Sequence, residues 1–316
     1  MSLILDNLSV AARYAVVGAC LWLPKSRQRS IERWLRGREE FSKNRRADFV
    51  LVSFGKSGRT WLRVMLSRVF QQLAGAGKDT MLEFDNFKRR DPTLPSLFFT
   101  HGNYLRDYTG HWDSKADFYD KKVVLLVRDP RDVAVSQYFQ WKYRMLPRKK
   151  MLNRYPPHGA EVSLFDFVMS ADSGLPVVLD FFEMWQRELP KVKDSLVVRY
   201  EDMRADPGRE LSRVLAFFSL PFTEAHVEEA VAFASYDNMK RLEQDRVFSG
   251  HGQRLLPGNK ANPDSYKVRR AKVGGYRDYF DDEQLAAIDA LMAQRPGPLF
   301  GYLSEAEPET SAKAAS

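Results

Sequence analysis

The sequence predicts an α/β fold in which a central, mostly parallel sheet is flanked by helices and carries a phosphate-binding strand–loop–helix unit. Apolar runs of strand length alternate along the chain with segments of helical periodicity, which is typical of a parallel sheet covered on both faces. Residues 123–127 are apolar throughout, as expected for a strand that is buried on both sides.

The expected elements follow one another in a regular order. Residues 49–54 form the first strand, a glycine-containing turn follows, and residues 60–73 form an amphipathic helix. Further strands are expected at 95–101, at 123–127 and within 194–203, and helices at 132–141, 163–171, 175–189, 207–218, 224–234 and 282–293. Residues 145–160 and 248–276 are rich in proline, glycine and basic residues and are expected to be loops.

We divide the chain into three parts. Residues 1–46 are expected to form an amphipathic, basic helical extension, because residues 25–46 contain nine basic and three acidic residues with apolar residues on one helical face. Two interpretations stay open for this extension: it contacts an anionic membrane surface, or it is a solvated helix docked on the main domain. Residues 47–302 form that domain, and residues 303–316 form a polar, disordered tail.

Composition limits the class of protein. The net charge of +8 favours an anionic ligand, a membrane surface or a nucleic acid. A single cysteine excludes a disulfide within the chain, and five scattered histidines show no metal-ligand spacing, so we expect no metal site. The apolar run 14–23 is too short to span a bilayer. We therefore expect a cytoplasmic protein, with the inner face of the membrane as a place of attachment.

The stretch VSFGKSGRTW, residues 52–61, resembles the end of a nucleotide-binding phosphate loop. The usual pattern G-x-x-x-x-G-K-[ST] would place its first glycine at residue 50, which is Val50. The turn still leads into a helix whose first N–H groups face outward, and Lys56 adds a positive charge. The stretch predicts a phosphate-like or sulfate-like ligand without choosing between them.

Four polar or aromatic residues follow the predicted strands. Lys56, His101, Arg128 and Tyr200 each stand at or just after a strand end. Parallel α/β sheets bind their ligands beyond the carboxyl ends of the strands. We therefore expect these four side chains on one rim of the sheet.

Four blocks of sequence, in order, resemble the sulfotransferases that use 3′-phosphoadenosine-5′-phosphosulfate (PAPS), of the cytosolic, bacterial-like type. They are FGKSGRTWL at 54–62, Thr100-His101, RDPRDVAVSQYFQW at 128–141 and RRAKVGGYRDYF at 269–280. The resemblance implies in-line transfer of a sulfuryl group from PAPS to a hydroxyl or amine of an acceptor, with no metal.

The resemblance also implies roles for individual residues. Lys56 would stabilise the leaving oxygen and His101 would act as the base, with Glu83 as the reserve base. The residues implied to bind the donor are Ser57, Gly58, Arg59, Thr60, Trp61, Arg128, Ser136, Tyr200, Tyr236, Arg269, Arg270 and Ala271. Among these, three aromatic residues would contact the adenine: Trp61, Tyr200 and Tyr236.

Two departures from the family pattern are notable. Arg59 stands where the family has a threonine, and Ala271 stands where it has a glycine, which puts left-handed backbone geometry there in question. Arg128 has a structural alternative, an ion pair with Asp129 or Asp132.

Rival interpretations are a phosphate-loop kinase or NTPase and a non-catalytic module that binds anions or membranes. The aromatic residues within 75–95, 103–119 and 142–175 suit an apolar or amphiphilic acceptor, such as a lipid or glycolipid, or one with sugars. We expect no nucleic-acid partner.

Overall fold

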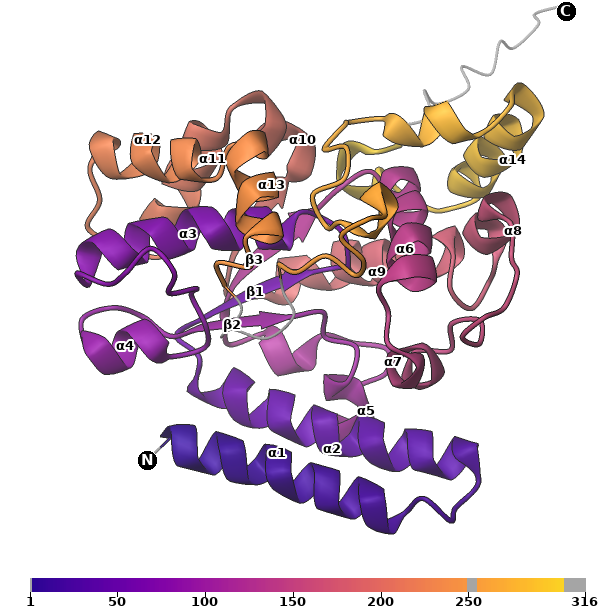
Figure 1. Ribbon diagram of the computed structural model, residues 1–316, viewed down its shortest axis with the longest axis horizontal. Coiled ribbons are helices and arrows are strands. Elements are labelled where there is room, and N and C mark those ends of the chain that lie inside the picture. Colours follow the sequence, from indigo (N-terminus) through magenta and orange to yellow (C-terminus); the bar gives the residue numbers. More distant parts are fainter. Residues whose placement is uncertain (1, 249–254, 304–316) are drawn as a thin grey trace, which may run out of the picture.

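A computed structural model describes residues 2–248 and 255–303 of the chain (Figure 1). Residues 304–316 of the expected tail and residues 249–254 of the expected loop lie outside the described residues.

The centre of the molecule is a four-stranded sheet in the order β2-β1-β3-β4. The strands are β1 (Phe49–Ser53), β2 (Leu97–Thr100), β3 (Lys122–Val127) and β4 (Asp194–Arg199). Every neighbouring pair is parallel. The prediction of a parallel α/β sheet is confirmed, and all four expected strand positions are occupied by strands.

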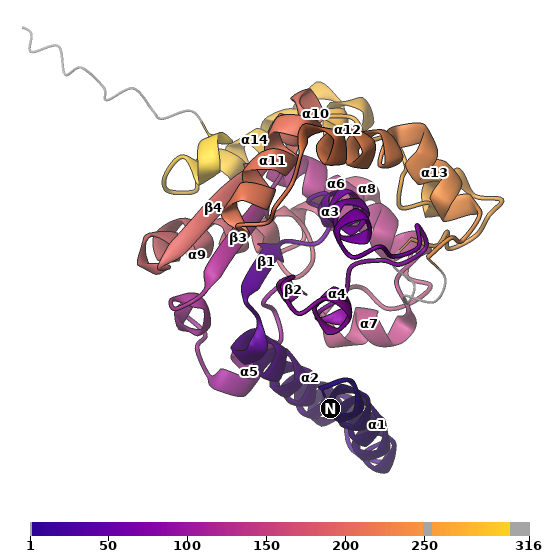
Figure 2. The same ribbon diagram turned by 90° about the vertical axis from the view of Figure 1, so that its left-hand side faces the viewer.

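Helices cover both faces of this sheet (Figures 1 and 2). Those of the main domain are α3 (Arg59–Leu73), α4 (Asn86–Arg90), α5 (Leu105–Thr109), α6 (Pro130–Tyr143), α7 (Pro147–Leu152), α8 (Leu164–Met169), α9 (Leu175–Glu188), α10 (Tyr200–Ala205), α11 (Pro207–Phe217), α12 (Glu224–Phe233), α13 (Tyr236–Gln244) and α14 (Asp282–Ala293).

Alternate residues of the central strands pack into two separate hydrophobic cores, one on each face of the sheet. Leu51 and Val124 point to one face, where α3, α11 and α12 pack, whereas Val50 and Leu125 point to the other, where α6, α9 and α14 pack. This alternation follows from the two-residue period of a strand. Because both faces are buried, the strand ends are the part of the sheet open to a ligand.

The N-terminal residues form a hairpin of two helices, α1 (Ser2–Ala19) and α2 (Lys25–Arg46). It lies along the bottom of the molecule in Figure 1. Trp34 and Phe41 of α2 pack on Tyr108, with ring centroids 5.2 and 5.3 Å apart. These contacts agree with the interpretation that the extension is docked on the main domain. No helix within residues 2–248 and 255–303 is long and apolar enough to cross a membrane.

One expected loop contains a helix. Residues 145–160 include α7, in which Lys150 and Leu152 are buried. The indole N–H of Trp141 donates to the carbonyl of Pro156 at 2.9 Å. These contacts pack the segment against its neighbours despite its basic residues and prolines. The segment is therefore partly helical and packed, and is not the open loop expected from the sequence.

Candidate active site

The residues expected on one rim lie around one cavity of about 1800 Å³ at the carboxyl edge of the sheet. Lys56, His101, Arg128 and Tyr200 all line it. Other expected residues on its wall are Gly58, Arg59, Thr60, Trp61, Glu83, Ser136, Tyr236, Arg269, Arg270 and Ala271. Ser57 is fully buried beneath the loop that carries Lys56.

The loop after β1 has a backbone that only certain residues tolerate. Lys56 has φ +75° and Gly58 has φ +94°. A Cβ atom on Gly58 would lie 2.5 Å from the ring of Tyr200, so glycine is required both by the backbone and by the packed ring. α3 begins at the next residue, and its first N–H groups have no intrahelical partner. The hydroxyl of Ser57 is buried without a hydrogen-bond partner in the described structure. The loop thus offers several donors to an anion.

Lys56 lies in a strongly cationic environment. Burial, followed by the nearby charges of Arg144 and Arg128, lowers its pKa to about 7. Burial and the charge of Lys56 also hold the pKa of Lys267 well below its usual range. Arg144 and Lys267 also line the cavity and were not expected from the sequence. An anionic ligand beside such groups would stabilise their protonated, charged form.

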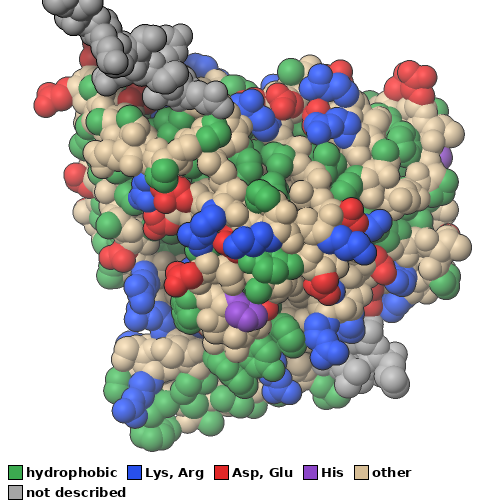
Figure 3. Space-filling model, turned by 180° about the vertical axis from the view of Figure 1, so that it is seen from behind, with side chains coloured by type: hydrophobic (Ala, Val, Ile, Leu, Met, Phe, Trp, Pro, Cys, Tyr) green, Lys and Arg blue, Asp and Glu red, His purple; other side chains and the backbone are tan. Residues whose placement is uncertain are grey.

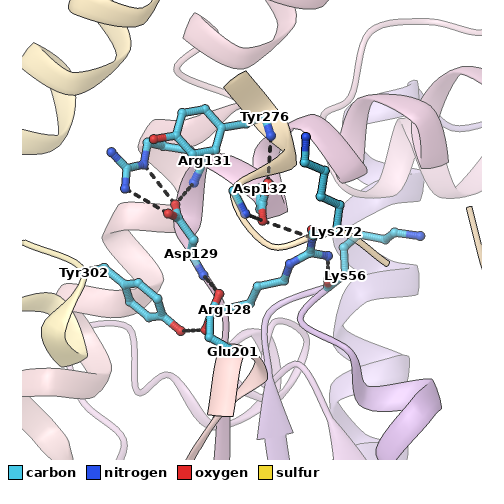
Figure 4. A network of polar contacts seen from close by, with 10 residues as sticks. Lys56, Arg128, Asp129, Arg131, Asp132, Glu201, Lys272, Tyr276 and Tyr302 are labelled. Carbon is cyan, nitrogen blue, oxygen red and sulfur yellow. Dashed lines mark hydrogen bonds and ion pairs between the residues drawn. The ribbon is translucent and has the colours of Figure 1, made fainter. Parts of the chain in front are cut away.

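Arg128 is held at the end of β3 by three contacts (Figure 4). Its guanidinium donates to the carbonyls of Lys56 at 3.4 Å and Lys272 at 3.1 Å, and forms an ion pair with Asp132 at 3.2 Å. The alternative raised from the sequence, an ion pair with Asp132, is therefore present. The Nε atom of Arg128 is nevertheless buried without a partner in the part of the chain described.

Carboxylates at the start of α6 fix the surrounding loops (Figure 4). Asp132 accepts from the backbone N–H groups of Gly274 and Tyr276, each at 2.9 Å. The backbone N–H of Asp129 donates to Glu201 at 3.0 Å, and Glu201 in turn contacts Tyr302. These bonds tie the ends of β3 and β4 to the 272–276 segment, which closes one side of the cavity.

The segment around Ala271 keeps a left-handed backbone despite the alanine, which has φ +50°. The question raised by the missing glycine is therefore answered: the conformation is retained. Arg269 lies over the ring of Phe139, 3.7 Å from its centroid, and Arg270 pairs with Asp278. Both guanidiniums engage other side chains while lining the cavity.

The three aromatic residues expected to contact the adenine, Trp61, Tyr200 and Tyr236, lie on the cavity wall. Their rings do not stack parallel to one another. The rings of Trp61 and Tyr200 are 5.9 Å apart and inclined by 69°. The hydroxyl of Tyr236 donates to the carbonyl of Arg269 at 2.9 Å. Arg128 lies over the Tyr200 ring at 4.4 Å, so aromatic and cationic surface are adjacent here.

His101 has both ring nitrogens engaged. Nδ1 lies 2.7 Å from the carbonyl oxygen of Ser53, and Nε2 lies 2.7 Å from Nη2 of Arg59. A carbonyl only accepts and a guanidinium only donates, so the imidazole is neutral with its proton on Nδ1. Burial, followed by the charge of Arg59, lowers the pKa of His101 well below its usual value.

A second carboxyl group near His101 was not expected from the sequence. Glu40 of α2 lines the cavity, and its Oε2 atom is buried without a partner among the described residues. Burial raises its pKa to about 7, while Thr100 and Arg59 act in the opposite direction. The reserve base, Glu83, lines the same cavity.

No group of three or more histidine, cysteine, aspartate or glutamate side chains is placed to hold a metal ion among the residues that the structure describes.

Comparison with known proteins gives a consistent picture. Residues 46–298 match the sulfotransferase domain family. The chain is 26% identical to cytosolic sulfotransferase 17 of Arabidopsis thaliana, over 81% of this chain and 76% of that protein. It is 26% identical to sulfotransferase 6B1 of Danio rerio, over 78% of this chain and 77% of that protein.

Solved structures share the fold. Mouse sulfotransferase SULT7A1 complexed with PAP superposes with a TM-score of 0.52 at 20% identity, covering 81% of this chain and 89% of that chain. The family match spans most of the chain and includes the four sequence blocks at 54–62, 100–101, 128–141 and 269–280, whereas the α2 residues that line the cavity, such as Glu40, precede it. On that match, the chain belongs to the sulfotransferase family and is a sulfotransferase enzyme.

Proposed function

We propose that this enzyme transfers a sulfuryl group from PAPS to a hydroxyl or amine of its acceptor, without a metal. The observation that carries the proposal is the pairing of two cationic positions, at Lys56 and Arg128, on one cavity. Each position has a buried donor atom without a partner among the described residues, Oγ of Ser57 next to Lys56 and Nε of Arg128 itself. PAPS has two anionic ends, a 5′-phosphosulfate and a 3′-phosphate, and fits such a pair.

We assign the donor-binding residues as follows. Lys56, the N–H groups of residues 57–60 and the hydroxyl of Thr60 hold the 5′ end. Arg128, Ser136 and the 269–271 segment hold the 3′-phosphate, since guanidinium groups match phosphate oxygens. The adenine contacts the rings of Trp61, Tyr200 and Tyr236, which lie on the same wall.

The donor supplies an activated sulfuryl group, and the protein supplies position and charge, as in phosphoryl transfer. Lys56 lies where negative charge develops on the leaving phosphate oxygen. The anionic donor favours the protonated form of Lys56, and this ammonium is suited both to stabilise that oxygen and to protonate it.

His101 is the proposed base. The Ser53 carbonyl fixes the Nδ1–H tautomer, which leaves Nε2 as the nitrogen that can accept a proton. Arg59 occupies Nε2 in this structure. The acceptor hydroxyl must replace this guanidinium, and we infer that Arg59 turns towards the anionic donor when the donor binds. Glu83 is the alternative base.

The acceptor is proposed to be an amphiphile, such as a lipid or glycolipid, reached at the cytoplasmic face of a membrane. The observation that favours membrane contact is the tip of the N-terminal hairpin. Leu21 and Trp22 are 62% and 81% exposed there. Lys25 and Arg27 follow within five residues of Trp22. Exposed tryptophan beside basic residues suits an anionic lipid surface. Figure 3 shows hydrophobic side chains along this lower edge of the molecule.

Donor binding is the first test. Calorimetric titration with 3′,5′-adenosine bisphosphate in the presence of EDTA should show tight binding, whereas ATP under the same conditions should bind weakly. A requirement for magnesium and a preference for ATP would instead support the kinase or NTPase interpretation. Binding without turnover, across a lipid and metabolite extract incubated with labelled PAPS, would support the non-catalytic module.

The base is tested by two substitutions. His101→Ala should lower kcat by about 10²–10⁴-fold and leave binding of 3′,5′-adenosine bisphosphate intact. Glu83→Gln should retain most of the turnover. The opposite pattern would assign the base to Glu83.

A further inference from the structure

Two half-buried cations, Arg106 and Lys115, form no ion pair with an acid among the residues that the structure describes. Both line the cavity. Neither side chain forms a hydrogen bond or ion pair with another residue within 2–248 or 255–303, and the Nε atom of Arg106 is buried without a partner. Buried cations normally have a partner, because their desolvation is otherwise uncompensated.

The acids near Arg106 are already paired. Asp107 accepts two hydrogen bonds from Arg33, at 2.8 and 3.0 Å. Asp180 pairs with Arg295 at 2.8 Å. Arg106 itself lies against the ring of Trp112, 5.1 Å from its centroid. This leaves the edge of its guanidinium available to a ligand.

Two acids lie near Lys115, Asp117 and Glu188, and both have other partners. Asp117 accepts from the hydroxyl of Thr109 at 3.0 Å and contacts Nδ1 of His111 at 3.1 Å. Glu188 accepts from the side chains of Tyr119, Arg187 and Lys191. Only the backbone N–H of Lys115 reaches Glu188, at 3.2 Å. Burial, and then the charge of Arg106, lowers the pKa of the Lys115 ammonium to about 8, and both side chains line the same cavity.

An apolar wall connects this pair to the phosphate loop. Phe54, at the start of the loop, meets Phe181 of α9 at 5.5 Å between ring centroids. Phe181 meets Trp185 at 6.3 Å, and the ammonium of Lys115 lies 5.7 Å from the Trp185 ring. Val177, Phe181 and Met184 occupy one face of α9, by their spacing, and line the cavity.

Topology places Arg106 away from the proposed donor residues, whereas Phe54, at the other end of the wall, adjoins the phosphate loop. The proposed donor residues follow β1, β3 and β4, whereas Arg106 lies in α5, which follows β2 at the edge of the sheet. His101 stands between β2 and α5. The cavity volume of about 1800 Å³ exceeds the roughly 300–1,000 Å³ of a typical single-ligand pocket, so it has room for a second molecule.

Resting on the proposed function, we propose that the acceptor carries an anionic group, a carboxylate or phosphate, which Arg106 and Lys115 bind. Its apolar body lies along the Phe54–Phe181–Met184 wall, and its hydroxyl reaches His101. The site therefore selects an anionic amphiphile rather than a neutral one.

The test compares octanoate with octanol as probes of the anionic group. Binding of each is measured by calorimetry on protein saturated with 3′,5′-adenosine bisphosphate. Octanoate should bind at least about tenfold more tightly, which is the usual effect of one charged hydrogen bond. In the double variant R106Q/K115Q the two probes should bind within about twofold of each other, with octanol affinity unchanged. The double variant K78Q/K193Q, which removes two exposed lysine charges elsewhere, is the charge-matched control.

Turnover provides the second readout. With ω-hydroxyoctanoate and its methyl ester as acceptors, kcat/KM should favour the carboxylate in the native enzyme and lose that preference in the double variant. Equal binding of the two probes, or an unchanged preference in the variant, would overturn the proposal. Failure of the proposed function would be seen separately, as absent binding of 3′,5′-adenosine bisphosphate, because octanoate and octanol are also titrated into the protein without that ligand.

Discussion

Binding of 3′,5′-adenosine bisphosphate should draw a proton onto Lys56. In the empty cavity the pKa of Lys56 is lowered to about 7, through burial and through the charges of Arg144 and Arg128. An anionic phosphate beside the ammonium favours its charged form and returns the pKa towards its ordinary value, near 10.4. Binding and protonation are therefore linked.

The magnitude follows from the two pKa values. At pH 8 about one tenth of Lys56 is protonated in the free enzyme and nearly all of it in the complex, so binding takes up about 0.9 proton. At pH 6 Lys56 is already about nine-tenths protonated, and its uptake falls to about 0.1 proton. The uptake thus increases as pH rises through the free-state pKa.

Calorimetry in buffers of different ionisation enthalpy measures this uptake. The difference between the native enzyme and Lys56→Met gives the contribution of Lys56 together with its coupling to Lys267, whose pKa the charge of Lys56 lowers. The titration of the ligand phosphates, with a pKa near 6, is common to both proteins. Residual uptake in the variant reports on Lys267. If the variant takes up as many protons as the native enzyme at pH 8, Lys56 does not contact the ligand phosphate and the assignment of the loop fails.

Three further predictions concern other parts of the molecule. Arg128→Ala should weaken the binding of 3′,5′-adenosine bisphosphate by about 1.5–3 kcal/mol more than the binding of adenosine 5′-phosphosulfate. Equal loss of affinity for the two ligands in titrations would mean that Arg128 has a purely structural role. Gly58→Ala should cost about 1–3 kcal/mol in chemical denaturation, and more than Gly75→Ala, which also has a positive φ but open space around it; equal costs would contradict the Tyr200 contact. Trp22→Ser should reduce cosedimentation with anionic vesicles while turnover of a soluble acceptor stays the same, and undiminished cosedimentation would remove the hairpin tip from the membrane contact.

The sheet was predictable because its strands are short apolar runs with a fixed relation to the residues that follow them. Once Val123 to Val127 is assigned as a buried parallel strand, Arg128 must lie at its carboxyl end, and the same reasoning places Lys56 and His101. The rim of the cavity thus follows from local pattern and topology together, without knowledge of any side-chain contact.

Residues brought in by tertiary contact could not be found in this way. Glu40 reaches the cavity only because α2 docks on α5, and Lys267 only because Glu243 accepts from the backbone N–H groups of Lys267 and Val268, at 2.7 and 2.9 Å. Neither stands near a strand end. Arg144 is likewise held by a buried ion pair with Glu243 at 2.9 Å. A pattern of apolar residues contains no signal for such pairs.

Arg59 shows most clearly what could not be predicted from the sequence. The sequence revealed a substitution of the family threonine, but not that its guanidinium would contact His101, which lies 42 residues further along the chain. Burial is the largest cause of the lowered pKa of the His101 imidazole, and the charge of Arg59 lowers it further. The fall in rate at acidic pH is therefore expected below the ordinary histidine range near 6.5, since protonation of His101 requires a lower pH than in water.

The same guanidinium connects the two halves of the proposed site. Arg59 is the first residue of α3, beside the helix N-terminus where the 5′ end of the donor is proposed to bind. An ionised oxygen accepts a stronger hydrogen bond than a neutral ring nitrogen does, so a bound donor competes with His101 for Arg59. When Arg59 moves to the donor, Nε2 becomes available to an acceptor hydroxyl and the nearest positive charge moves away from the ring, which raises the basicity of the imidazole. The base is then ready only when the donor is in place, and the order of events, donor before acceptor activation, follows from one contact that the family threonine could not make.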